Sequence, residues 1–141
     1  AQSFGGNKKY GDSVLVHGAL NVGDTATGAN STLQVTGSVA MSIVEKTADY
    51  TLNANDYTVI AKAASEMTLT LPTAKDCAGR IYTIKKVPGS GGAASDLDNP
   101  VNVAAATGEH IEDGDNYVIY NSWTYITLQS NGTDTWYIIK K

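Results

Sequence analysis

Short segments in which apolar and polar residues alternate recur along most of the chain. Residues 67–71 (Met-Thr-Leu-Thr-Leu) are the clearest example, and they end at Pro72, which cannot donate a hydrogen bond within a sheet. Such alternation is the pattern of a β-strand that buries one face. The other segments with this period are 50–53, 57–60, 80–87, 101–103, 117–120, 123–129 and 135–139. Only residues 61–66 and 73–78 leave room for a helical turn, so the sequence predicts an all-β fold.

The spacing of these segments narrows the fold class further. They are short, numerous and separated by turn-forming residues, which favours a short-stranded antiparallel β-sandwich or a β-roll or prism module. Asn131-Gly132 between the last two segments is a strong signal for a β-hairpin. Residues 88–100 are rich in Gly, Ser, Ala and Asp, and form the longest expected loop.

The first third of the chain contains an internal repeat. Gly18 and Gly37 lie 19 residues apart, and apolar residues flank each glycine at alternate positions. These apolar positions are Val14, Val16, Leu20 and Val22 in the first copy and Leu33, Val35, Val39 and Met41 in the second. Turn-forming residues 23–30 separate the copies, so two strands joined by a loop are expected, with chance alternation as the alternative.

The chain is accordingly divided into an extended N-terminal β-arm (1–23), a β-repeat connection (24–44) and a β-module (45–141). The apolar residues Val14, Val16, Leu20 and Val22 of the arm form the candidate assembly contact. A strand of this kind can add to the open sheet edge of a neighbouring copy by backbone hydrogen bonds. Repeated head-to-tail contacts would build an open filament. The alternative is that the arm packs on its own module.

Composition excludes several classes of function. Ten Lys and Arg against fourteen Asp and Glu give a net charge of −4, which argues against a nucleic-acid partner. Charged residues make up 17% of the chain, below the roughly 25% usual for soluble domains, as in many extracellular β-proteins. The first residues, Ala-Gln-Ser, fit cleavage of a signal peptide, so a secreted protein is expected, with an arbitrary chain boundary as the alternative. No apolar run reaches the roughly 18 residues of a membrane span, so no membrane insertion is expected.

Residue patterns typical of catalysis are missing from the sequence. His17 and His110 lie in separate segments, without the spacing of a metal-binding pair. Residues 89–92 lack the Lys-Ser/Thr of a phosphate loop, and no nucleophile elbow is present. Cys77 is the single cysteine, which excludes an internal disulfide, and it is expected to be a buried apolar side chain, with a reactive thiol as the alternative. We therefore expect no enzyme activity and no cofactor.

An acidic stretch in the second half of the chain raises the question of calcium. Carboxylate and amide oxygens, which calcium accepts as ligands, are supplied by Glu109, Glu112, Asp113, Asp115 and Asn116, together with Asp96 and Asp98. The spacing matches no EF-hand, and tight turns require the same residue types. Turn formation is therefore the preferred interpretation, with calcium binding as the alternative.

Aromatic residues gather in the last quarter of the chain. In segment 123–129, alternation places Trp123, Tyr125, Thr127 and Gln129 on one face, and Thr124, Ile126 and Leu128 on the other, which we assign to the core. Tyr and Trp offer large amphipathic contact areas. Tyr120, Trp123 and Tyr125 are therefore a candidate contact either for a glycan or for another subunit.

The order of these segments resembles that of the C-terminal β-modules of phage tail-fibre and receptor-binding proteins and of related secreted bacterial surface proteins. The matching segments are 50–52, 57–60, 68–72, 79–86, 127–133 and 136–139, preceded by 33–39. The resemblance implies a homo-oligomer with a structural or receptor-binding role. We expect a non-enzymatic extracellular protein that self-assembles through β-strand contacts into a fibre or filament on a bacterial surface. The alternative is a trimeric receptor- or glycan-binding module of a phage tail fibre, located on the virion.

Overall fold

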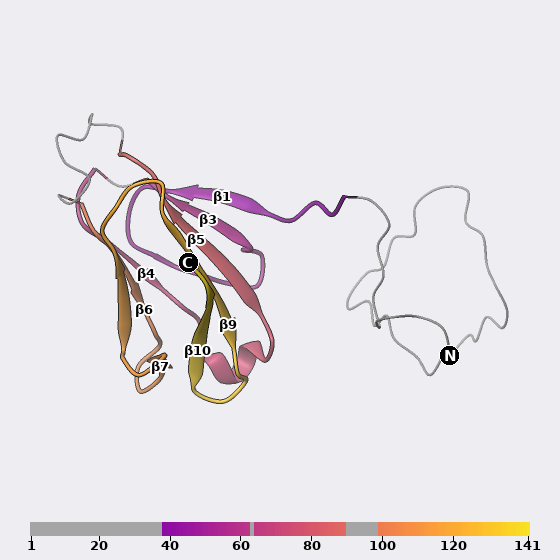
Figure 1. Ribbon diagram of the computed structural model, residues 1–141. Helices are drawn as coiled ribbons and strands as arrows, with labels where there is room; N and C mark the ends of the chain where they lie inside the picture. The colour runs from indigo at the N-terminus through magenta and orange to yellow at the C-terminus, as the bar shows by residue number, and fades with distance from the viewer. Residues whose placement is uncertain (1–37, 63, 90–98) are drawn as a thin grey trace, which may run out of the picture. The chain divides into compact units, whose positions relative to one another are not determined.

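The structure is a computed structural model that describes residues 38–62, 64–89 and 99–141. Within it, Ala40–Lys141 form one compact unit (Figure 1). The N-terminal arm, with Val14, Val16, Leu20 and Val22, lies outside the described residues, as do the first copy of the repeat, residue 63 and most of the 88–100 loop. Of the second copy, Val39 and Met41 are described, and both are exposed.

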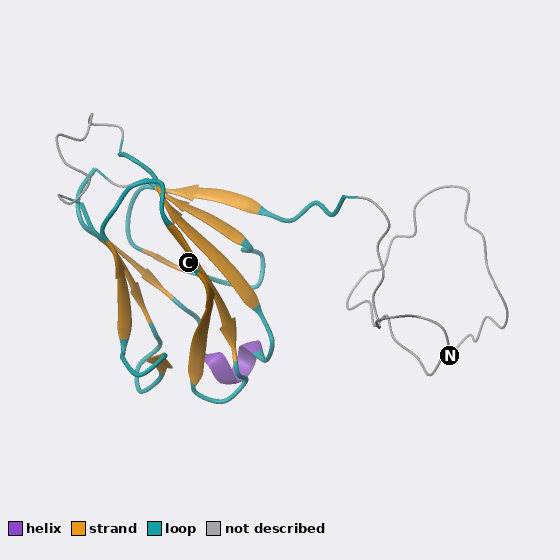
Figure 2. Ribbon diagram, viewed as in Figure 1, coloured by secondary structure: helices purple, strands orange, loops and turns teal. Residues whose placement is uncertain are grey.

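The described unit is all-β, with ten strands and one 3₁₀-helical turn, η1 (Ala74–Cys77), inside the predicted 73–78 (Figure 2). The six-stranded sheet contains, in spatial order, β1 (Ile43–Lys46), β3 (Thr58–Ala61), β5 (Ile81–Lys86), β9 (Tyr125–Ser130), β10 (Thr135–Lys140) and β7 (His110–Ile111). The four-stranded sheet contains β2 (Tyr50–Thr51), β4 (Met67–Thr70), β6 (Val101–Ala104) and β8 (Asn116–Ile119). No helix in these ranges is long and apolar enough to cross a membrane.

The chain coils between the two sheets. From β1 to β8, odd-numbered strands lie in the six-stranded sheet and even-numbered strands in the four-stranded sheet. The first strands therefore stack in parallel, with β1 beside β3 and β3 beside β5 in one sheet (Figure 1). In the other sheet, β2 lies beside β4 and β4 beside β6. Each turn of this coil lies on the preceding turn.

The expected antiparallel arrangement is wrong for most of the described sheet pairings. Five of the eight strand pairs are parallel, and the antiparallel ones are β5–β9, β9–β10 and β6–β8. Parallel neighbours need a crossover connection, which is usually a helix. Here a strand of the opposite sheet makes the crossover. Alternation in the sequence reports which face of a strand is buried and carries no information on the direction of its neighbour.

Alternating burial of the strands produces one hydrophobic core. The burial patterns of β3, β4, β5, β6 and β9 alternate strictly, as the sequence predicts. Their buried apolar side chains, together with Trp136 of β10, belong to a single cluster that both sheets share. Cys77 is buried in this cluster, as expected. The predicted hairpin at Asn131-Gly132 is confirmed, since it joins the antiparallel strands β9 and β10.

Candidate functional site

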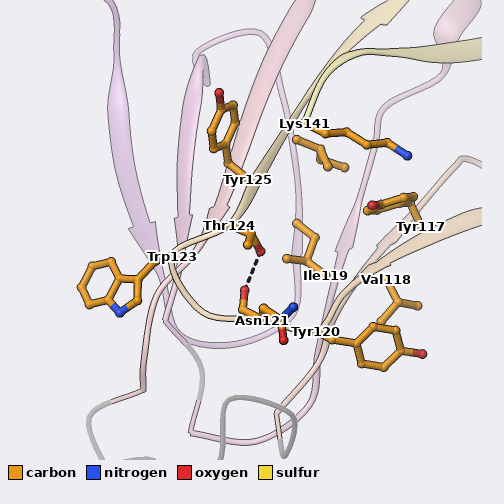
Figure 3. A pocket seen from close by; sticks show the side chains of 10 residues that line it. Tyr117, Val118, Ile119, Tyr120, Asn121, Trp123, Thr124, Tyr125 and Lys141 are labelled. Carbon is orange, nitrogen blue, oxygen red and sulfur yellow. Dashed lines mark hydrogen bonds between the residues drawn. The ribbon is translucent and has the colours of Figure 1, made fainter.

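The turn between β8 and β9 forms one wall of a surface pocket with a volume of about 390 Å³ (Figure 3). We call this hollow the aromatic pocket, because Tyr117, Tyr120, Trp123 and Tyr125 line it together with Lys141. Figure 3 shows Trp123 and Tyr120 projecting outward on opposite sides of the turn, with Ile119 between them. Trp123 is 65% exposed and Tyr120 is 55% exposed, so both side chains offer large apolar surfaces to solvent.

Trp123 occupies a backbone conformation that a bulky residue rarely adopts. Its φ is +67°, in the left-handed region, and β9 begins only at Tyr125. The prediction that alternation extends from Trp123 is therefore wrong, because the positive φ turns the chain before the strand starts. The core face predicted for the segment is confirmed at Ile126 and Leu128, which are buried, whereas Thr124 is exposed.

Lys86, the last residue of β5, makes hydrogen bonds to this turn. Its side chain is only 4% exposed, and its Nζ donates a hydrogen bond to the carbonyl oxygen of Tyr120. The backbone N–H of Trp123 donates to the carbonyl of Lys86 at 2.9 Å, and the N–H of Lys86 donates to the carbonyl of Thr124 at 3.0 Å. Thr124 Oγ1 donates in turn to the carbonyl of Asn121 (Figure 3). Hydrogen bonds within the turn and to Lys86 therefore fix its conformation.

The ammonium groups of three lysines lie near rings of the aromatic pocket. Lys141 Nζ lies 4.8 Å from the ring centroid of Tyr117. Lys140 Nζ lies 5.8 Å from the centroid of Tyr125, and Lys85 Nζ lies 6.0 Å from that of Trp123. Among the described residues, no aspartate or glutamate lines the pocket. On a chain with a net charge of −4, this hollow is therefore a local positive region.

A second feature is the open end of the coil, which is formed by β1 and β2. Each is the outermost strand of its sheet, and no described strand pairs with its outer edge. The carbonyls of Ser42 and Lys46 accept hydrogen bonds from β3 and the residue after it. Because backbone groups in a parallel strand alternate in direction, those of Ile43 and Glu45 face the unpaired edge. Met41 and Ile43 are 55% and 70% exposed.

Carboxylates of the acidic stretch accept hydrogen bonds from backbone groups that lie far away in the sequence. Glu109 is buried, and its Oε2 accepts a hydrogen bond of 2.8 Å from the N–H of Ala74, the first residue of η1. Glu112 Oε1 accepts one of 2.7 Å from the N–H of Ile138. Asp115 Oδ1 lies 3.4 Å from His110 Nδ1. Among the described residues, no group of three or more His, Cys, Asp and Glu side chains gathers as a metal site would require.

The single thiol, that of Cys77, lies in a separate, partly buried hydrogen-bond network. Arg80 Nη1 donates to Cys77 Sγ at 3.2 Å and to the hydroxyl of Tyr82 at 3.3 Å, and that hydroxyl donates to the carbonyl of Asn53. Burial raises the pKa of the Cys77 thiol and that of the Tyr82 phenol. A raised pKa keeps the thiol protonated at neutral pH, which is the unreactive form.

The structure therefore brings together the three aromatic residues singled out in the sequence, Tyr120, Trp123 and Tyr125, at one pocket. Sequence reasoning missed Lys141 and the supporting Lys86, since both reach the turn from other strands and no local pattern marks them. It also missed the exposure of Ile43. Neither a scan of protein-family models nor a search of curated proteins finds a match to this sequence.

Proposed function

We propose that the chain is a non-enzymatic structural protein of a bacterial surface, which is secreted and self-assembles through β-strand contacts into a fibre or filament. The observation that carries this proposal is the open end of the coil, where both sheets terminate in a strand whose outer edge is unpaired in the described chain. The path of the chain between the sheets supports a β-roll as the finer description of the fold.

An unpaired strand edge is a template for a further strand. Proteins that stay monomeric commonly protect such edges with lysines, prolines, bulges or a covering loop. At the open end, Met41 and Ile43 instead expose apolar side chains. Of the charged side chains beside this end, Lys62 and Glu45 pair with each other at 3.4 Å, and Lys46 Nζ lies 3.6 Å from the ring centroid of Tyr50. This surface favours continuation of the sheet by another strand.

The arm supplies the strand that suits this edge. Val14, Val16, Leu20 and Val22 alternate with polar residues, as an added edge strand requires. Donation of the arm from one copy to the open end of the next is a head-to-tail contact, which does not close on itself unless the geometry forms a ring. The proposal therefore predicts an open linear polymer.

The test is electron microscopy by negative stain, with light scattering after size exclusion, on the full chain at micromolar concentration. Three variants accompany it: a chain lacking residues 1–23, Ile43→Lys at the edge, and Ile139→Lys as a matched control. Ile139 is 51% exposed but lies on β10, which has neighbours on both sides. The full chain and the control are expected to form filaments, whereas the other two remain small. Assembly of the truncated chain at the same level as the full chain would contradict the proposal.

The alternative is a trimeric receptor- or glycan-binding module of a phage tail fibre, and the aromatic pocket is the observation that favours it. The same experiment separates the two functions. Compact particles of about three chains would support the fibre module, whereas long filaments support the structural subunit.

A further inference from the structure

We propose that the aromatic pocket is a binding site for an acidic oligosaccharide, a sugar chain that carries carboxylate groups. The site is built from β8, the β8–β9 turn, the start of β9 and the residue after β10, whereas the proposed assembly contact uses β1 and β2. The inference therefore stands independently of the proposed function.

The first argument is the chemistry of the lining. The volume of about 390 Å³ lies in the range of small-molecule sites, at roughly 300–1,000 Å³. Ring faces of Tyr and Trp provide flat apolar surfaces beside a polar tip, which suits the apolar C–H face and polar rim of a pyranose. Asn121 and Thr124 contribute amide and hydroxyl groups to the same lining. The combination of flat rings and uncharged hydrogen-bonding groups fits a saccharide.

The second argument is that the exposed aromatic residues are held in place. Trp123 keeps a left-handed φ of +67°, a strained conformation for a residue with a large side chain. Strain of this kind persists where surrounding contacts enforce it, and it is concentrated at functional sites. Here the enforcing contacts come from Lys86, through its backbone to Trp123 and through its Nζ to Tyr120. A preorganised site loses less conformational entropy when it binds.

The third argument concerns charge and selects an acidic sugar over a neutral one. Lys141 belongs to the lining, and the Nζ atoms of Lys85 and Lys140 lie within 6.0 Å of the ring centroids of Trp123 and Tyr125, respectively. No carboxylate side chain of the described chain lines the pocket. The chain as a whole has four more acidic than basic residues. A carboxylated ligand would therefore be attracted to this hollow by its lysines.

The test is titration of the full chain with 3′-sialyllactose and with trigalacturonic acid, followed by calorimetry and by tryptophan fluorescence. Lactose and maltotriose serve as neutral counterparts. The chain has two tryptophans: Trp123 is 65% exposed, whereas Trp136 is fully buried, so a change in fluorescence on binding reports Trp123. Saturable binding of at least one acidic sugar is expected, with weaker binding as salt rises.

Variants locate the site. Trp123→Ala is expected to weaken binding roughly tenfold, as for an exposed aromatic anchor. Lys141→Gln is expected to weaken binding of the acidic sugar while leaving the weak binding of its neutral counterpart unchanged. Tyr137→Ala is the control, because Tyr137 is 49% exposed and lies outside the lining.

Three outcomes would overturn the inference. One is the absence of saturable binding of both acidic sugars to the full chain. The second is equal affinity for the acidic and neutral sugars, which would remove the role of charge. The third is that Trp123→Ala changes the oligomeric state and leaves sugar binding intact, because the pocket would then be a contact between copies. Circular dichroism of each variant establishes that its fold is retained.

Discussion

The rings of Tyr82 and Trp136 stack in the centre of the core, with their centroids 5.4 Å apart and their planes inclined by 30°. The two residues belong to β5 and β10, which are separated by β9. Both side chains are fully buried. The stack therefore joins strands that share no backbone hydrogen bonds, and it ties the parallel coil to its antiparallel C-terminal hairpin.

Removal of the Trp136 ring should lower the stability of the fold. Trp136→Ala is expected to lower the free energy of unfolding by about 3–5 kcal/mol, the usual result of deleting a large aromatic side chain from a core. Trp136→Phe should cost less, because the indole Nε1 has no hydrogen-bond partner among the described residues and phenylalanine retains a ring. Urea denaturation followed by circular dichroism measures both changes. Trp123→Ala, at an exposed position, is the control and should change stability little.

The β9–β10 hairpin depends on the lack of a side chain at Gly132. Its φ is +77°, and a Cβ at this position would lie 2.7 Å from the Cβ of Ala78. Gly132→Ala is therefore expected to cost more than 2 kcal/mol, since steric overlap adds to the roughly 1–2 kcal/mol of a left-handed residue. The quantity to measure is again the free energy of unfolding in urea.

A matched variant separates the cost of steric overlap with Ala78 from the cost of the left-handed backbone. Gly108 has a φ of +80°, and a Cβ there would meet nothing within 4 Å, so Gly108→Ala reports the backbone cost alone. Combining Gly132→Ala with Ala78→Gly should recover part of the loss, since the two sites are in contact. Equal losses for the two single alanine variants would show that the contact with Ala78 is unimportant.

The turn that carries Trp123 should loosen when Lys86 loses its ammonium group. Lys86→Met keeps a similar length and apolar stem but cannot donate to the carbonyl of Tyr120. We expect faster hydrogen exchange of the Trp123 amide, which donates to the Lys86 carbonyl in the intact turn. Lys75→Met, at an exposed position in η1, is the control. Unchanged exchange in Lys86→Met would mean that the backbone contacts alone fix the turn.

Most strands could be predicted from the sequence, because burial of one face imposes alternation wherever a strand is long enough. β7 has only two residues, His110 and Ile111, which is too short for a period to be detected. The hairpin at Asn131 was predictable for a local reason: its Oδ1 accepts hydrogen bonds from the N–H groups of Thr133, Asp134 and Thr135. A turn of this type is specified by neighbouring residues.

The parallel coil and the complete aromatic pocket could not be predicted, because both depend on non-local relationships. Ile43, Thr58 and Thr83 occupy one register across three strands, although the connections between them differ in length. Lys141 reaches the pocket only because β10 ends beside the β8–β9 turn. The turn in which Trp123 has its positive φ is likewise held in part by Lys86, which lies on another strand.

Stability should fall at alkaline pH through two buried groups. Burial raises the pKa of Cys77 and of Tyr82, so the folded state favours their protonated forms. Their contribution is fully present below the unfolded pKa values, about 8.5 for a thiol and about 10 for a phenol, and is lost as the pH rises through the higher folded values. Urea denaturation between pH 7 and pH 11 is expected to show this decline.

Substitutions assign the decline to each group. Cys77→Ala should flatten the part of the decline that begins near the thiol pKa, and Tyr82→Phe should flatten the part that begins near the phenol pKa. A decline that persists in both variants would have to come from another group.

Burial of the thiol also predicts its reactivity. Ellman's reagent is expected to react with Cys77 in the native protein only as fast as the surrounding core opens, and promptly in urea. Rapid reaction with the native protein would place the thiol at the surface.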